Sequence, residues 1–218
     1  MNNTTFYTAT GLVDFSLADY PSSMNATLCK YDWEHATYWG IFVFTELDKH
    51  GLCVEPGDVF LDLGANLGMS SRYALLHGAR EVLCFEPDPR LMELLKRNLA
   101  ASSRFYPYFV LDTRGTSSEE YWPGGTGERY SAPAITLKDV LTFLSYPIID
   151  YLKMDIEGAE DTIFNDLNWQ DCAKIKKMLV EHHFPNKTPE MMAKLNQLGF
   201  NIEVEWGSGQ NMLYCRHV

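Results

Sequence analysis

Short apolar runs alternate with helix-length amphipathic stretches along most of the chain after residue 50. The run Val59-Phe60-Leu61-Asp62-Leu63, followed at once by glycine, is typical of a parallel strand buried on both faces. Similar runs at 81–86, 106–111, 148–154 and 177–180 predict further strands. Helices are predicted between and after them, over 69–77, 89–98, 160–165 and 189–198, with a short one that Thr136 caps. This alternation predicts a mostly parallel sheet with helices on both faces.

The pattern changes at three places. Runs at 200–206 and 211–216, joined by Gly207-Ser208-Gly209-Gln210, predict an antiparallel hairpin. Residues 112–133 are rich in Gly, Ser and Pro and predict a long loop, which in a compact domain is usually functional or mobile. In the first 50 residues only the aromatic-rich stretch 38–47 predicts a helix. We therefore expect one domain over 51–218, with residues 1–50 as an N-terminal helical and aromatic segment packed on its core.

Composition limits the class of protein. The 218 residues suit a single hydrophobic core, and 18 basic against 29 acidic residues give a net charge of −11. This balance argues against a broad binding surface for nucleic acid or for anionic membrane. The sequence has no apolar run of about 20 residues and no N-terminal signal pattern, so a soluble, cytoplasmic protein is expected. Five scattered cysteines without a CxxC pair indicate buried thiols rather than disulfides or a zinc site.

A glycine turn follows the first predicted buried strand. The segment Asp62-Leu63-Gly64-Ala65-Asn66-Leu67-Gly68 ends this strand and opens a helix, which lets backbone approach a ligand closely. Its glycines have the spacing GxxxG, with Asn66 in the middle, and the missing third glycine argues against a nicotinamide dehydrogenase. Glu86 ends the next strand, where a carboxylate can bind ribose hydroxyls. The alternatives are that the glycines only allow helix and strand to pack, and that Glu86 caps the next helix.

Three segments together resemble the FkbM-type family of S-adenosylmethionine-dependent methyltransferases. They are 59–68, 84–89 and 149–160, and the last has the form DxLKxDxEGxE, the family's most specific signature. The resemblance covers roughly residues 55 to 215. It implies a class I methyltransferase fold: an α/β, doubly wound, mostly parallel seven-stranded sheet with a C-terminal antiparallel hairpin. It also implies S-adenosylmethionine as cofactor and methyl transfer to a hydroxyl of a sugar, glycan or small natural product.

The resemblance implies positions for the cofactor. Four residues of the glycine turn would line its methionine and ribose part: Asp62, Gly64, Asn66 and Gly68. Glu86 would hold the ribose hydroxyls, Asp112 would lie near the adenine amino group, and Asp155 would lie beside the sulfonium. Carboxylates at this edge of the sheet can balance the positive charge of a sulfonium.

The proposed catalytic residues are Asp155, Glu181 and His183. Glu181 and His183 follow the fifth strand and so reach the same edge of the sheet as Asp155. A histidine, with an ordinary pKa of about 6.5, is suited to take a proton from an attacking hydroxyl. Surface histidines at a strand exit are the alternative. The three side chains also offer oxygen and nitrogen ligands for a divalent metal, but the resemblance does not require one and we predict none.

Four further residues are expected near the acceptor: Lys153, Glu157, Tyr121 and Trp122. Lys153 in an apolar strand end is costly unless paired, so we expect a carboxylate partner, and a substrate contact stays open. Glu157 is expected to face the pocket; alternatively, Glu157 and Glu160 are only charges at a helix N-terminus. Tyr121 and Trp122 offer rings on which a sugar can stack, or they pack a lid onto the core.

Two other functions stay open from the sequence. One is methylation of nitrogen in protein or RNA, which the net charge disfavours for RNA. The other is a catalytically silent binding module, although such a protein has no need for the intact glycine turn, Glu86 and Asp155 together. We expect a small-molecule or glycan acceptor and neither a nucleic acid nor a membrane as partner.

Overall fold

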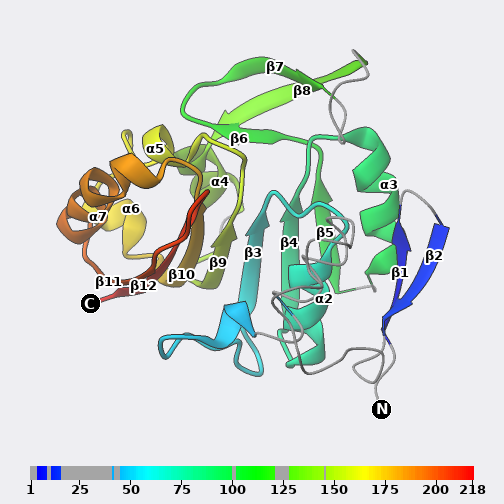
Figure 1. Cartoon of the computed structure of the whole chain (residues 1–218), viewed down its shortest axis with the longest axis horizontal. Coiled ribbons are helices and arrows are strands. Elements are labelled where there is room, and N and C mark those ends of the chain that lie inside the picture. The colour runs from blue at the N-terminus through cyan, green and yellow to red at the C-terminus, as the bar shows by residue number, and fades with distance from the viewer. Residues whose placement is uncertain are drawn as a thin grey trace.

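The computed structural model describes residues 4–8, 11–15, 41, 45–99, 102–120, 128–144 and 146–218 (Figure 1). Its centre is a seven-stranded sheet in the order β11-β12-β10-β9-β3-β4-β5. The strands are β3 (Val59–Leu63), β4 (Glu81–Phe85), β5 (Ser103–Tyr106), β9 (Ile149–Met154), β10 (Ile175–His182), β11 (Phe200–Glu205) and β12 (Asn211–His217). Neighbours from β10 to β5 pair in parallel, and β12 is antiparallel to β10 and β11. The predicted fold class and C-terminal hairpin are confirmed.

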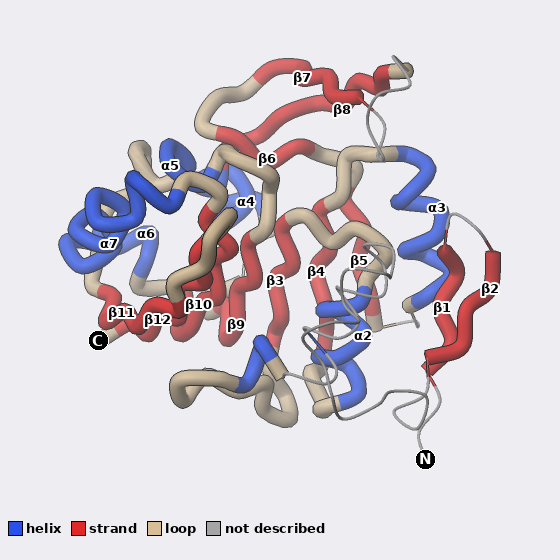
Figure 2. The backbone as a smooth tube through the Cα atoms, in the orientation of Figure 1, coloured by secondary structure: helices blue, strands red, loops and turns tan. Residues whose placement is uncertain are grey.

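Helices cover both faces of this sheet (Figure 2). Side chains alternate along β3, so Val59, Leu61 and Leu63 belong to one buried cluster while Phe60 belongs to another. The first cluster is closed by α4 (Leu137–Phe143), α5 (Glu160–Ile163), α6 (Trp169–Cys172) and α7 (Thr188–Gln197). The second is closed by α2 (Met69–Leu76) and α3 (Pro89–Asn98). This two-sided burial explains why the central strands are nearly continuous apolar runs.

Local sequence accounts for where the helices begin and end. The Asp88 side chain accepts the backbone N–H groups of Arg90 and Leu91 and so caps α3. Thr136 and Asp139 form the reciprocal capping box that starts α4. Helix α2 stops just before Gly78, whose φ of 91° is a conformation that glycine adopts without strain. The predicted start and stop of α2 and the predicted starts of α3 and α4 are confirmed to within two residues.

The predicted loop over 112–133 is wrong at 115–120 and 129–133, which form strands. Strand β7 (Gly115–Glu120) pairs antiparallel with β8 (Arg129–Thr136), and β8 pairs in parallel with β6 (Phe109–Leu111). Figure 1 shows this three-stranded sheet beyond the carboxyl ends of β3 and β4. The strand predicted over 106–111 is divided, because β5 ends at Tyr106 and β6 begins a new sheet after Pro107. Proline has no N–H to continue a ladder, which explains the break.

The N-terminal part differs from a purely helical segment. Strand β1 (Thr4–Thr8) pairs antiparallel with β2 (Gly11–Phe15), and β1 lies beside α3. Residues 46–48 form a 3₁₀ turn, η4 (Glu46–Asp48), and most of the predicted helix over 38–47 lies outside the described residues.

A second 3₁₀ turn, η5 (Pro185–Lys187), precedes α7. Among the described helices, none has the length and apolar character needed to cross a lipid bilayer.

Candidate active site at the carboxyl ends of the strands

A cleft of about 500 Å³ opens where β3, β4, β9 and β10 end. Its wall is built from segments 64–67, 85–88, 108–111 and 153–157, with Glu181 and Gln210 on the far side. The three-stranded sheet contributes Glu119, Glu120 and Tyr130. The volume is that of a small-molecule site, and its position outside the strand ends is where doubly wound sheets bind ligands.

The glycine turn brings two strand ends together. Gly64 has φ 75°, and a Cβ there would lie 1.7 Å from the carbonyl oxygen of Asp155, so only glycine fits. The Asp155 N–H in turn donates to the Leu63 carbonyl at 3.0 Å. Gly68 serves packing, because a Cβ would lie 2.6 Å from Leu95 Cδ1 of α3, and Gly68 is not part of the cleft wall. Gly64 and Asn66 do line the cleft.

Glu86 is a buried carboxylate at the cleft wall, with 5% of its surface exposed. One oxygen accepts the Asn66 N–H and the other accepts the Asp88 N–H, both at 2.8 Å. Burial raises the pKa of Glu86 to about 7, although these two amides oppose the shift. Each carboxylate oxygen can accept a further hydrogen bond, so Glu86 is held in place with capacity left for ligand hydroxyls.

Lys153 joins the ends of β3 and β9 in the cleft wall. Its ammonium donates to the Gly64 carbonyl at 2.9 Å and lies 3.4 Å from Asp155 Oδ2 and 3.6 Å from Asp62 Oδ1. Burial by itself would lower the pKa of Lys153, but Asp155 and Asp62 outweigh it and raise that pKa, so the lysine stays charged. Asp62 is fully buried, also accepts the Ser71 hydroxyl at 2.6 Å, and has its pKa raised by burial. The expected carboxylate partner of Lys153 is confirmed.

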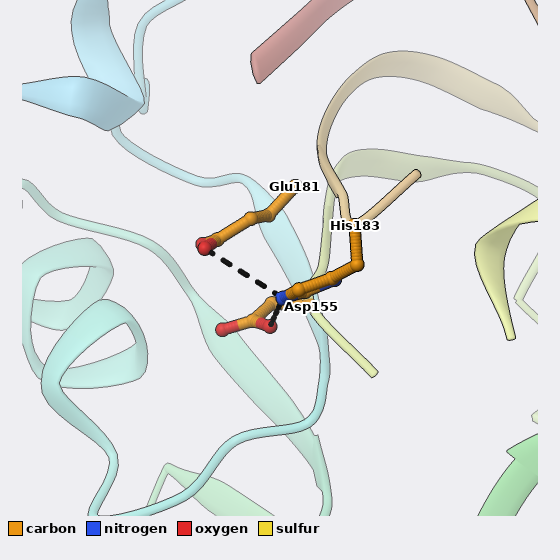
Figure 3. A group of neighbouring side chains, drawn as sticks. All are labelled: Asp155, Glu181 and His183. Atoms are coloured by element: carbon orange, nitrogen blue, oxygen red, sulfur yellow. Dashed lines mark ion pairs between the residues drawn. The ribbon is translucent and has the colours of Figure 1, made fainter. Parts of the chain in front are cut away.

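The structure brings together the three proposed catalytic side chains (Figure 3). His183 Nε2 lies 3.8 Å from Asp155 Oδ1 and 3.9 Å from Glu181 Oε1. Asp155 and Glu181 line the cleft, while His183 reaches them from the connection after β10. Asp155 Oδ1 is buried and accepts no hydrogen bond from the described residues. Glu157 Oε2 also approaches His183 Nε2, at 3.4 Å.

Their charges are set by one another. The hydrogen bond that His183 donates to Glu160 raises the pKa of His183; burial opposes this shift, and the charges of Glu160, Asp155 and Glu157 reinforce it. Burial raises the pKa of Glu181, as does the Asp155 charge, while Lys153 and His183 lower it. In the cofactor-free protein at neutral pH, His183 is therefore an imidazolium surrounded by carboxylates. It must release its proton before it can act as a base.

Comparison with known proteins decides the family. The family model "Methyltransferase FkbM domain" matches residues 62–202, which include the glycine turn, Glu86 and the Lys153–Glu160 motif. The chain belongs to the FkbM methyltransferase family. A 31-O-demethyl-FK506 methyltransferase FkbM from Streptomyces tacrolimicus is 25% identical over 202 residues, covering 72% of this chain and 78% of the relative. Methyltransferase sdnD from Sordaria araneosa is 26% identical over 206 residues, covering 71% and 80%.

Solved structures agree with the fold of this FkbM methyltransferase. Fibrillarin from Aeropyrum pernix, solved with S-adenosyl-L-methionine, has a TM-score of 0.50 at 14% identity and covers 78% of this chain and 71% of its own. A conserved hypothetical protein from Streptococcus pyogenes has a TM-score of 0.52 at 12% identity, covering 79% and 94%. At such identities the likeness shows the fold alone. The family membership makes the chain an S-adenosylmethionine-dependent methyltransferase.

The residues of this FkbM methyltransferase fit its cofactor. Glu86 offers carboxylate oxygens for hydroxyls, Gly64 and Asn66 bring backbone to the cleft wall, and Asp155 has a buried oxygen without a hydrogen bond. A sulfonium carries positive charge, and the carboxylates of the cleft outnumber its cations among the described lining residues. The cleft can therefore hold a cationic methyl donor by its own charges.

The same triad could also hold a divalent cation by spacing alone, since one ligand atom from each residue lies within 4.8 Å of the others. Asp155, however, already has the Lys153 ammonium at 3.4 Å, and His183 carries a proton that a metal would have to displace. Two cations of the chain, Lys153 and His183, therefore already lie beside this cluster. This charge balance favours the predicted metal-free site.

The remaining predicted residues lie elsewhere. Asp112 is exposed and outside the cleft wall, Asp62 lies beneath it, and Tyr121 and Trp122 are outside the described residues. Glu157 lines the cleft. Glu160 is fully buried beside His183 rather than being a solvated helix charge, and Gln210 donates to Glu181 at 2.7 Å. The family motif contains Glu160 and could have pointed to it, whereas nothing in the glycine-rich turn marked Gln210.

Proposed function

We propose that this FkbM methyltransferase transfers the methyl group of S-adenosylmethionine to a hydroxyl oxygen of a sugar, glycan or small natural product. The observation that supports it is the juxtaposition of Asp155, Glu181 and His183 at the edge of the cleft. An alcohol must lose a proton as it attacks the methyl group, so a nearby proton acceptor favours oxygen. The relative named for methylation of 31-O-demethyl-FK506 supports a small natural product as the acceptor class.

The residues divide the work between binding and proton transfer. Glu86, Gly64 and Asn66 hold the cofactor, which supplies an electrophilic methyl group when bound. Asp155, which lines the cleft, would face the positive charge of the bound donor. Glu181 and His183, 3.9 Å apart, form the group that takes up the proton leaving the hydroxyl. The main contribution to rate is the positioning of the acceptor oxygen in line with the methyl group.

The test is methyl transfer from labelled S-adenosylmethionine to matched acceptors. We expect label in monosaccharides or polyhydroxylated natural products, in a product stable to mild alkali, as an ether is. Glu181→Gln should lower the rate by about 100-fold or more while cofactor binding stays within a few-fold of wild type. Label only in peptides or RNA would instead support nitrogen methylation, and absence of both label and cofactor binding would support a binding module.

Removal of divalent metal is expected to leave the reaction intact. Because Lys153 and His183 supply the positive charge around Asp155, dialysis against EDTA should change neither the initial rate nor the melting temperature. The comparison is the rate before dialysis, after it, and after addition of Mg²⁺ or Mn²⁺. A rate that falls on chelation and returns with the added cation would overturn the metal-free site.

A further inference from the structure

Two successive histidines at the end of β10 each pair with an acid from the start of α5. His182 Nε2 lies 2.6 Å from Asp161 Oδ1, and His183 Nδ1 lies 3.1 Å from Glu160 Oε1. The two pairs come from adjacent residues on both elements, yet they use opposite ring nitrogens. This difference decides what each ring can do.

The His182 pair is closed. The ring is fully buried, and its other nitrogen, Nδ1, lies 2.8 Å from the Thr188 hydroxyl. Both ring nitrogens are thus satisfied inside the protein, which gives His182 a structural role. The His183 pair is open, because its Nε2 faces the carboxylates of Asp155, Glu157 and Glu181 at 3.4 to 3.9 Å, at the edge of the cleft.

Glu160 is held rigidly in this arrangement. Its side chain is fully buried, and the oxygen that faces His183 also accepts the N–H groups of Ile156 and Gly158 at 3.1 and 3.2 Å. These bonds fix a turn in which Glu157 has φ 57° and Gly158 has φ 114°. Burial by itself would raise the pKa of Glu160, but the hydrogen bonds from His183 and the backbone outweigh it and lower that pKa. An ionised carboxylate only accepts hydrogen bonds, so the ring atom facing it must carry hydrogen.

We propose that Glu160 is a positioning residue that keeps one proton of His183 on Nδ1 and thereby makes Nε2 the ring atom that exchanges a proton at the cleft. The inference rests on the proposed function, in which the exchanged proton comes from the acceptor hydroxyl. The acceptor oxygen gains the methyl group, the O–H bond breaks, and its proton passes to Nε2, while the cofactor sulfur keeps the electron pair of the broken S–CH₃ bond. Carboxylate partners fix histidine tautomers in this way in many proteins.

The sign of the expected pH effect follows from the groups that face the ring. These are Glu157 in the turn before α5, Glu160 as the first residue of α5, Asp155 after β9, and Glu181 on β10. The Lys153 ammonium beside Asp155 is an opposing charge. All four carboxylates favour the imidazolium. Replacing Glu160 with neutral glutamine removes the one that hydrogen-bonds the ring, so the pKa of His183 should fall by about one unit or more.

The experiment is a pH titration of the imidazole resonances by ¹H–¹⁵N NMR on the cofactor-free protein. His183→Asn assigns the signals of His183 by their loss. We expect wild-type His183 to titrate above the ordinary histidine range and its neutral form to be protonated on Nδ1. Glu160→Gln should lower the titration midpoint of His183. The matched control Asp161→Asn should move the ring resonances of His182, which contacts Asp161, and leave the His183 midpoint unchanged.

Two results would overturn the proposal. One is the finding that neutral His183 in the wild-type protein carries its proton on Nε2. This measurement needs no variant, so it tests the proposal even if Glu160→Gln does not fold. The other is a folded Glu160→Gln protein with an unchanged His183 midpoint, which would leave Glu160 as only a brace of the turn. Calorimetric titration of the same proteins with S-adenosylmethionine is a separate readout. If the wild-type protein does not bind the cofactor, the proposed function fails while the tautomer result stands on its own.

Discussion

Glu86→Ala is expected to weaken S-adenosylmethionine binding by about 100-fold or more. Hydrogen bonds to a charged group contribute roughly 1.5–3 kcal/mol each, and two ribose hydroxyls on one carboxylate would lose about 3 kcal/mol or more. The variant also frees the N–H groups of Asn66 and Asp88, which Glu86 now holds in the cleft wall. Isothermal titration calorimetry with S-adenosylmethionine and S-adenosylhomocysteine on both proteins measures the loss.

The control for this prediction lies on the next helix. Glu93 is on the exposed side of α3, with 66% of its side chain in solvent, so Glu93→Ala should bind the cofactor as wild type does.

Because burial raises the pKa of Glu86 to about 7, the carboxylate ionises as the pH rises through this value, and the affinity of the wild-type protein for the cofactor should rise with the pH. Thermal unfolding of the variants separates lost contacts from lost fold. A Glu86→Ala protein with wild-type affinity would remove Glu86 from the cofactor site.

Much of the fold could be predicted because burial on both faces leaves few choices of residue. All five positions of β3 are buried and four of them are apolar, and its exit must be glycine where Gly64 meets the Asp155 carbonyl. Those two requirements are visible in the sequence, and they locate both the sheet and the cleft. The Glu160 arrangement, in contrast, depends on β10 and α5 lying side by side, which no local pattern shows.

The errors have a common cause in the segment after β5. Strand β7 is mostly exposed, β8 is buried only at Ala132 and Ala134, and the two strands carry Ser, Gly, Glu and Pro. Their composition is therefore that of a loop even though they pair with each other. The resemblance implies that Asp112 lies near the adenine amino group, directly after a strand predicted to end at Leu111. The central strand ends at Tyr106, and the residues that follow it into the cleft wall are Tyr108 to Leu111. These residues, not Asp112, occupy that side of the cleft.

Lys153→Met is expected to lower the free energy of unfolding by about 3–5 kcal/mol, the usual cost of removing one partner from a buried ion pair. The lysine side chain is 13% exposed and lies between Asp62 and Asp155, so its removal takes away the ion pair of the fully buried Asp62 and leaves Asp155 with only His183, at 3.8 Å. It also removes the donor to the Gly64 carbonyl and so loosens the glycine turn. Urea unfolding of wild type and variant, compared at constant m-value, measures the difference.

A matched variant and a double variant make this prediction specific. Lys176 pairs with Asp150 at 2.6 Å but is 61% exposed, so Lys176→Met should cost about 1 kcal/mol or less. Asp62→Asn in the Lys153→Met background should recover part of the lost stability, because it removes the fully buried carboxylate that the lysine had balanced. Equal losses for Lys153→Met and Lys176→Met would contradict the buried network. If the double variant recovered nothing, the lysine would act through Asp155 and the glycine turn, and Asp62 would be held by Ser71 alone.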